Sequence, residues 1–239
     1  MTREEQNALA KKLFFLTKKY ANNDLFDFFI NKDHRLIHKW VNYFPVYEKW
    51  FKKFRNTDVV FVEVGVFQGG SLQMWKEYFG KKATIIGVDI NKRCKNLEED
   101  QITVEIGSQE DVNFWEEFKT KYPRVDVFLD DGGHTMNQQI VTFQQMFPHV
   151  QNNGIYMCED CHTSYWEKYG GGLNHPDTFI EFSKKIIDML NATVSKGALQ
   201  PNYFTESIDG IHFYKSMVIF EKFDQQVENL SCKFGTPSF

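Results

Sequence analysis

Acidic residues stand at the ends of three apolar runs of the sequence. They are Glu63, the neighbours Asp130 and Asp131, and the neighbours Glu159 and Asp160. If the runs are parallel strands, their carboxyl ends meet at one edge of a sheet, where open α/β sheets bind ligands. Carboxylates gathered there would repel one another unless a cation lay among them. A hard divalent ion such as Mg²⁺ takes oxygen ligands and keeps positions open for water or substrate.

We therefore predict a Mg²⁺ site formed by Asp131, Glu159 and Asp160, with Asp130 nearer to a cofactor. Adjacent strand residues point to opposite faces, so Glu159 and Asp160 can both ligate only if the chain turns between them. Otherwise one of the two does not contact the metal and instead orients a residue that does. The alternative is that these acids only cap helices and bind loop amides.

His134 follows Asp131 by three residues and has three candidate roles. An imidazole titrates near neutrality, so it suits proton removal better than any carboxylate in this group. We predict that His134 is a general base, with Asp131 beside it in the catalytic group. A metal ligand and a structural histidine are the alternatives.

Cys158 and Cys161 form a C-x-x-C pattern that could indicate zinc or redox chemistry. Cys94 and Cys232 are isolated, so no second pair lies at the spacing of a zinc finger. The sequence favours two cysteines on the core side of an acidic strand end.

A glycine-rich turn follows the first apolar run. Residues 61–71 read Phe-Val-Glu-Val-Gly-Val-Phe-Gln-Gly-Gly-Ser, and a second apolar run, 83–88, ends in Asp89. This order of a strand, a Gly loop, a helix and a second strand that ends in an acid is typical of sites for nucleoside-containing cofactors. The acid binds the ribose hydroxyls in such sites. The spacing lacks the full G-x-G-x-x-G pattern, and a plain α/β turn is the alternative. The candidate cofactor residues are Glu63, Gly65, Gly69, Gly70, Ser71 and Asp89.

The segment after Asp160 is a candidate substrate loop. It contains His162, Tyr165 and Trp166 and runs into three glycines, 170–172. The flat faces of Tyr165 and Trp166 could stack on a sugar ring, or they could equally fill the core.

The elements that must position these residues alternate along the chain. From residue 57 we expect strands at 59–64, 83–88, 102–106, 125–130 and 153–158, and helices at 71–79, 92–98, 110–120, 137–148 and 177–191. This alternation predicts an α/β fold with a doubly wound, mainly parallel sheet. Residues 208–222 predict an antiparallel hairpin that turns around 214–216.

Residues 1–56 predict a helical cap before a main domain at 57–239. Their basic and aromatic character could also suit a polyanion or a membrane surface. The net charge of −4 argues against a general nucleic-acid binder. Four cysteines without an apolar signal segment, and the absence of a long apolar run, predict a soluble cytoplasmic protein without a membrane partner.

Taken together, residues 57–222 resemble the macrocin and mycinamicin sugar O-methyltransferases, a metal-dependent branch of the class I methyltransferases related to the cephalosporin-hydroxylase-like group. The resemblance rests on residues 63–71, Asp89, the Asp-Asp-Gly-Gly-His run 130–134, residues 159–166 and the terminal hairpin. The family usually has Ser where this chain has Gly133. Its larger members have a much longer N-terminal domain, so the quaternary structure, including a homo-oligomer, stays open.

The resemblance implies a seven-stranded Rossmann-like sheet that binds S-adenosylmethionine (SAM), with the adenine near Ser108 and Gln109. It implies Mg²⁺ on Asp131, Glu159 and Asp160, and His134 as the base that deprotonates a sugar hydroxyl during methyl transfer. The acceptor would be a deoxysugar, such as rhamnose, in a glycan or a glycosylated metabolite. The competing functions are a hydroxylase-like or hydrolytic use of the same acids and a non-catalytic SAM-binding module.

Overall fold

The computed structural model describes residues 12, 14–31, 33–223 and 232–236. Seven strands form one sheet in the order β3-β2-β1-β4-β5-β7-β6. The strands are β1 (Val60–Val64), β2 (Thr84–Asp89), β3 (Ile102–Ile106), β4 (Val125–Asp130), β5 (Val150–Cys158), β6 (Ile208–Tyr214) and β7 (Met217–Lys222). The first five pair in parallel, and β7 lies antiparallel between β5 and β6. The predicted α/β architecture and its closing hairpin are confirmed.

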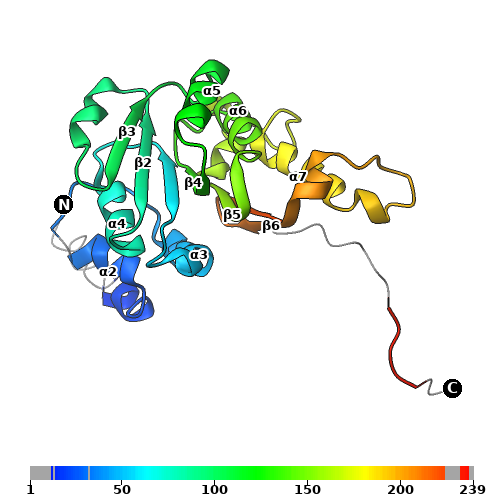
Figure 1. Cartoon of the computed structure of the whole chain (residues 1–239), viewed down its shortest axis with the longest axis horizontal. Helices are drawn as coiled ribbons and strands as arrows, with labels where there is room; N and C mark the ends of the chain where they lie inside the picture. Colours follow the sequence, from blue (N-terminus) through cyan, green and yellow to red (C-terminus); the bar gives the residue numbers. More distant parts are fainter. Residues whose placement is uncertain (1–11, 13, 32, 224–231, 237–239) are drawn as a thin grey trace.

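Helices connect the parallel strands. The α-helices are α2 (Asp24–Asn31), α3 (Phe44–Phe51), α4 (Gly70–Phe79), α5 (Val112–Lys121), α6 (Met136–Met146), α7 (Phe179–Leu190) and α8 (Tyr203–Ser207). The 3₁₀ turns are η1 (Val41–Tyr43), η2 (Lys52–Phe54), η3 (Lys92–Leu97), η4 (Cys161–Tyr165), η5 (Glu167–Tyr169) and η6 (Ala192–Val194). Figure 1 shows α2 and α4 toward the β2 and β3 end of the sheet, and α7 toward the β6 end.

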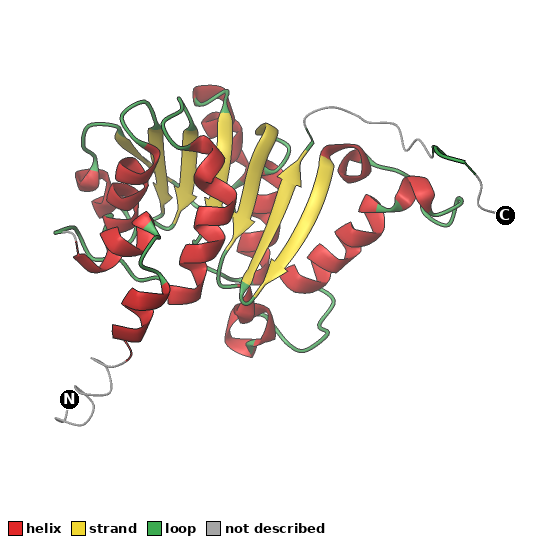
Figure 2. Ribbon diagram, turned by 90° about the horizontal axis from the view of Figure 1, so that it is seen from below, coloured by secondary structure: helices red, strands yellow, loops and turns green. Residues whose placement is uncertain are grey.

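Each face of the sheet carries its own apolar core. Neighbouring residues of β1 point in opposite directions, so Phe61 belongs to one core and Val62 to the other. Helices cover both faces (Figure 2), which explains why the central strands read as continuous apolar runs. This arrangement leaves the carboxyl ends of the strands as the natural place for polar chemistry.

The N-terminal helices share a core with the sheet. Phe51 of α3 packs edge-on against Phe61 of β1 and Trp75 of α4, and residues of α2 belong to the same cluster. Within the described part of the predicted cap, α3 therefore lies on one face of the sheet, and α2 packs on α3 and α4. The division at residue 56 stays a prediction, and residues 1–11 lie outside the described part of the chain.

Most of the expected elements agree with the structure within two residues at each end, and two differ in type or by more than that. The helix expected at 92–98 is the 3₁₀ turn η3, in which the amide of Cys94 bonds the carbonyl of Asn91 three residues earlier. Strand β5 begins at Val150 rather than 153, because Val150 pairs with Val125 beyond a register shift. Neither change moves the carboxyl end of a strand.

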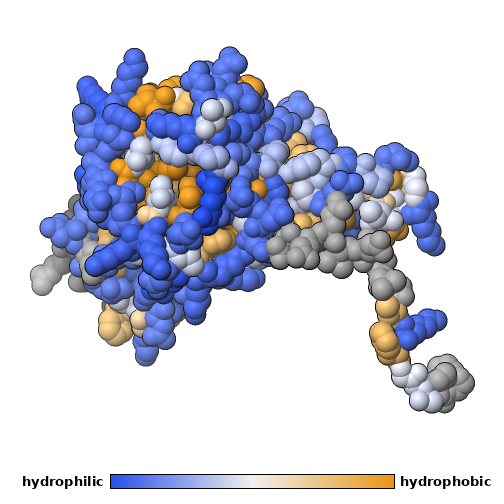
Figure 3. Space-filling view, in the orientation of Figure 1, coloured by the Kyte–Doolittle hydropathy of each residue, from blue (hydrophilic) through white to orange (hydrophobic). Residues whose placement is uncertain are grey.

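Among the described residues, no helix has both the length and the apolar character that a membrane span requires. Figure 3 shows mostly hydrophilic residues on the face in view, with apolar residues confined to patches between them.

Candidate active site

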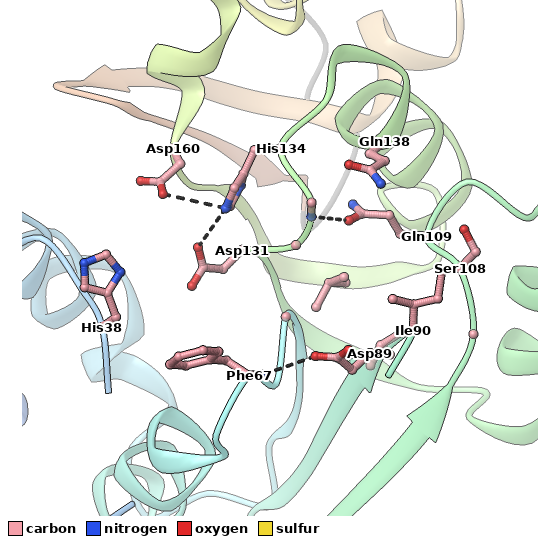
Figure 4. Close-up of a pocket in the computed structure, with 16 residues that line it drawn as sticks. His38, Phe67, Asp89, Ile90, Ser108, Gln109, Asp131, His134, Gln138 and Asp160 are labelled. Carbon is pink, nitrogen blue, oxygen red and sulfur yellow. Dashed lines mark hydrogen bonds and ion pairs between the residues drawn. The ribbon is translucent and has the colours of Figure 1, made fainter. Parts of the chain in front are cut away.

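A cavity of about 400 Å³ opens at the carboxyl ends of β1, β2 and β4. Its size is within the range of small-molecule sites, roughly 300–1,000 Å³. Strand order reverses between β1 and β4, and open α/β sheets bind ligands at such a switch point. Several residues predicted from the sequence line the cavity: Gly65, Asp89, Ser108, Gln109, Asp131, His134 and Asp160. Figure 4 shows Asp89 at one end of this group, and Asp160 and His134 at the other.

Asp89 lies at the end of β2 and is held by the Gly loop. Its Oδ2 accepts the amides of Val66 (3.0 Å) and Phe67 (3.1 Å), and its Oδ1 accepts the amide of Asn91 (2.8 Å). These three bonds fix the carboxylate at the cavity wall. A carboxylate oxygen has more than one acceptor position, so Asp89 can still receive hydroxyl groups of a ligand.

Gly65 allows the ends of β1 and β4 to approach each other. Its φ of +95° belongs to a region that other residues rarely adopt, and a Cβ there would lie 2.0 Å from the carbonyl oxygen of Asp131. A side chain at this position would push the loop after β4 away from the cavity.

Five of the predicted cofactor residues do not line the cavity: Glu63, Gly69, Gly70, Ser71 and Asp130. Glu63 is fully buried at the end of β1 and accepts the Ser71 hydroxyl at 2.6 Å. Gly69 and Gly70 begin α4, where a Cβ on Gly70 would lie 2.1 Å from the carbonyl oxygen of Arg35. These residues pack beneath the loop that follows β1. Their predicted role as cofactor contacts stays a prediction.

Asp130 also lies beneath the cavity floor. It is 1% exposed, and its Oδ1 accepts the amide nitrogen of the Gln109 side chain (3.0 Å). The side-chain oxygen Oε1 of Gln109 in turn accepts the Gly133 amide (2.7 Å). Burial raises the pKa of Asp130 to about 7. The Asp130–Gln109 pair therefore shapes the loop that carries Asp131 and His134.

Asp131, His134 and Asp160 converge at the mouth of the cavity. One ligand atom from each lies within 4.8 Å of the others. His134 Nε2 lies 3.9 Å from Asp131 Oδ1 and 3.7 Å from Asp160 Oδ2. Two hard carboxylate oxygens suit Mg²⁺, and the imidazole nitrogen beside them could ligate the ion or take a proton from a bound group. The donor set thus fits the cation expected from the sequence.

The backbone is strained at two of these three residues. His134 has φ of 60° and Asp160 has φ of 51°. Side chains other than glycine occupy this left-handed region at a cost, and such residues cluster at functional sites. The turn at Asp160 also separates it from Glu159, which points into the protein interior.

Lys39 is a buried cation that sequence reasoning missed. Its Nζ lies 2.6 Å from Asp131 Oδ2, 3.1 Å from Glu63 Oε1 and 3.1 Å from Glu159 Oε2. Burial lowers the pKa of the Lys39 ammonium, but the three carboxylates more than offset this and hold the pKa well above its usual range. Lys39 therefore supplies part of the positive charge that the clustered acids require.

Glu159 has both carboxylate oxygens engaged inside the protein. Oε2 accepts Lys39, and Oε1 accepts the hydroxyl of Tyr47 in a short hydrogen bond. Glu159 is fully buried and does not line the cavity. The structure brings Asp131 and Asp160 together with His134, whereas the predicted role of Glu159 as a ligand stays a prediction.

No protein-family model matches the sequence. The chain is 31% identical over 190 residues to demethylmacrocin O-methyltransferase of Streptomyces fradiae, an alignment that covers 74% of this chain and 48% of that protein. It is 32% identical over 190 residues to mycinamicin VI 2''-O-methyltransferase of Micromonospora griseorubida, with 74% and 47% covered. The MycE methyltransferase of the mycinamycin biosynthetic pathway, solved in complex with Mg, SAH and mycinamycin VI, matches with a TM-score of 0.72 and 28% identity. That match covers 87% of this chain and 52% of MycE. The chain belongs to the macrocin and mycinamicin sugar O-methyltransferase family.

Within this family, the chain spans about half the length of the curated relatives it matches. It also departs from the pattern at Gly133, where the resemblance leads us to expect Ser. A Cβ on Gly133 would lie 2.1 Å from Oε1 of Gln138. Gln138 accepts the Thr135 amide in the capping box that begins α6. The Gln138 side chain therefore fills the space that a side chain at position 133 would need.

The predicted substrate residues of this family member lie beside Asp160. His162 stacks on Trp40 at 4.9 Å between ring centroids, and Trp166 meets His162 edge-on at 4.5 Å. Tyr165 and Trp166 are about half exposed. An apolar groove of about 550 Å³ runs past Trp40, His162 and Tyr165. Surface aromatic rings adjoin the carboxylate cluster, while Cys158 and Cys161 are free thiols buried in the core.

Proposed function

We propose that this chain carries a SAM-dependent, Mg²⁺-dependent O-methyltransferase activity toward a deoxysugar hydroxyl of a glycosylated metabolite. One observation carries the proposal. A single cavity has Asp89, the acid expected to bind a ribose, at one end. At the other end, one carboxylate oxygen each of Asp131 and Asp160 faces the imidazole of His134. The relatives' names specify O-methylation of demethylmacrocin and mycinamicin VI, and a further relative is named for O-methylation of a rhamnosyl tetracenomycin, which supports a sugar hydroxyl as the acceptor.

The residues then take separate roles. Asp89 would bind the ribose hydroxyls of SAM, and Ser108 and Gln109 would lie beside the adenine. SAM supplies an electrophilic methyl group, which leaves its sulfonium as the acceptor oxygen forms the new bond. His134 Nε2 would receive the hydroxyl proton, because this nitrogen faces the acceptor end of the cavity. Two strained residues, His134 and Asp160, fix that end.

We further propose that Asp131 Oδ1 and Asp160 Oδ2 hold the Mg²⁺. Glu159 would not contact the ion but would hold Lys39, which in turn binds Asp131. Both oxygens of Glu159 are engaged, whereas Asp131 and Asp160 each turn one oxygen toward His134. Bound Mg²⁺ would acidify an acceptor hydroxyl and fix its orientation. Of the three acids predicted as ligands, Asp131 and Asp160 at the cavity mouth are therefore the ones that would bind the ion directly.

The acceptor would lie with its sugar at this cluster and its apolar part in the groove past Trp40, His162 and Tyr165. Rings exposed on either side of a sugar site offer flat faces for stacking. Incubating the chain with SAM and a panel of macrolide and polyketide glycosides, and measuring a methyl mass shift with and without EDTA, tests the activity. A hydroxylated or hydrolysed product would favour the competing enzyme classes, and SAM binding without turnover would favour a binding module.

Replacing Asp89 with alanine is expected to weaken SAM binding by about 2–4 kcal/mol, because hydrogen bonds to the ribose, one or more of them charge-assisted, are lost. Calorimetric titration with SAM measures the change. Asp58→Ala is the control, since Asp58 pairs with the exposed Arg124 away from the cavity. An Asp89→Ala protein that binds SAM as tightly as the parent would rule out the ribose role.

Asp160→Asn is expected to lower Mg²⁺ affinity by more than the roughly 10–100-fold that removal of a residue supporting a ligand costs. Glu159→Gln is expected to lower it by no more than that. Both substitutions keep the size of the side chain and replace one carboxyl group with an amide. Titration of each protein with MgCl₂ therefore compares the two positions. The reverse order of effects would make Glu159 the ligand. Exhaustive chelation should abolish turnover, and activity that survives it would overturn the metal proposal.

A further inference from the structure

Three donors from the N-terminal segment reach the carboxylates at the ends of β4 and β5. They are the ammonium of Lys39 and the hydroxyls of Tyr43 and Tyr47. Their side chains are buried: Tyr43 is 1% exposed, Tyr47 is fully buried, and the Lys39 side chain is 2% exposed. The donors come from residues 39–47, before the first strand, while the acids come from residues 131–160. The contacts therefore depend on how the N-terminal segment packs.

Two of these donors each bind one oxygen of an aspartate. Asp131 Oδ2 accepts a hydrogen bond from Lys39, and Asp131 Oδ1 faces His134. Asp160 Oδ1 accepts the Tyr43 hydroxyl at 2.6 Å, and Asp160 Oδ2 faces His134. In each aspartate, one oxygen is held from the N-terminal side and the other faces the cavity mouth.

We propose that Lys39 and Tyr43 are positioning residues that fix the free oxygens of Asp131 and Asp160 before Mg²⁺ arrives. This inference rests on the proposed metal site. It adds that two residues of the N-terminal segment orient the ligands of that site. A carboxylate without such a partner rotates about its terminal torsion, which is broad for aspartate. The site would then have to order both ligands at the moment of binding, and affinity would fall.

Tyr43 offers the sharper test, because Tyr43→Phe removes one oxygen and changes no charge at neutral pH. Burial and the bond to Asp160 raise the pKa of Tyr43 far above neutrality, so its hydroxyl remains a donor. Loss of a residue that orients a metal ligand is expected to weaken Mg²⁺ binding about 10- to 100-fold. Affinity for SAM, measured by the same calorimetric titration, is expected to stay within about twofold of the parent value, because Tyr43 does not line the SAM cavity.

Tyr78→Phe is the matched control. Its hydroxyl also donates to a carboxylate, that of Glu48 at 2.8 Å, but this pair joins α3 to α4 away from the cavity. Thermal unfolding in EDTA reports the structural cost of each substitution. We expect both tyrosine variants to lose some stability and only Tyr43→Phe to lose Mg²⁺ affinity.

The outcomes separate the two proposals. Failure of the parent protein to bind Mg²⁺ would overturn the metal site itself. If the parent binds Mg²⁺ and Tyr43→Phe binds it equally well, the metal site stands and the positioning role is wrong. Equal losses of Mg²⁺ affinity in Tyr43→Phe and Tyr78→Phe would show a general effect of packing and would also overturn the inference.

Discussion

His134→Ala is expected to lower kcat by roughly 10²–10⁴-fold, the usual contribution of a general base. The imidazole Nε2 faces both free carboxylate oxygens at the cavity mouth, so it lies where an acceptor hydroxyl would lose its proton. SAM affinity should persist, because the lost group contributes to the transition state more than to this ground-state ligand. Single-turnover kinetics with a confirmed acceptor measures the effect.

The pH dependence of the same reaction separates a base from a structural histidine. The rate of the parent enzyme should rise with pH along one limb, because a general base must be neutral to accept a proton. That limb should disappear in His134→Ala. Ionisation of a metal-bound hydroxyl could produce a similar limb, so the comparison with the variant is decisive. An alanine variant within a few-fold of the parent rate would assign the activation to the metal alone.

Much of this fold follows from local sequence patterns. The apolar runs that become β1, β2 and β4 are continuous because helices cover both faces of the sheet, and their ends are marked by acids. Since parallel strands end at the same edge, the runs alone bring Asp89, Asp131 and Asp160 to one side of the molecule. The terminal hairpin was equally clear, because its turn at 215–216 separates two short apolar runs.

The finer arrangement of the acids could not be predicted from the strands. Glu159 and Asp160 are neighbours, and only the left-handed turn at Asp160 decides which of them faces the cavity. The contacts of Lys39 with Asp131 and Glu159 join residues 92 and 120 positions apart, and nothing in a local pattern measures such distances. One signal was available: a lysine between His38 and Trp40, in an aromatic segment that must bury its apolar face, is a candidate for a buried cation.

Lys39→Met is expected to lower the free energy of unfolding by about 3–5 kcal/mol, the usual cost of removing one partner from a buried ion pair. The substitution keeps the length of the side chain but leaves Glu63 and two further carboxylates without their cation. Urea denaturation in EDTA measures the change without interference from metal. Lys222→Met is the control, because Lys222 is also buried but donates only to the backbone carbonyls of Phe147 and Pro148.

The loss in Lys39→Met should depend on pH in a defined direction. Burial already raises the pKa of Glu63 in the parent protein, and removal of the ammonium removes the main influence that lowers it. The folded variant then binds a proton on Glu63 more tightly than the unfolded chain does, so its stability falls as pH rises above the unfolded value of about 4.3. The difference in the free energy of unfolding between Lys39→Met and the parent should therefore be larger at pH 8 than at pH 5. Adding Glu63→Gln removes one of the uncompensated charges, so the double variant should be more stable at pH 8 than Lys39→Met alone. A Lys39→Met protein as stable as Lys222→Met at both pH values would show that the three carboxylates do not depend on this lysine.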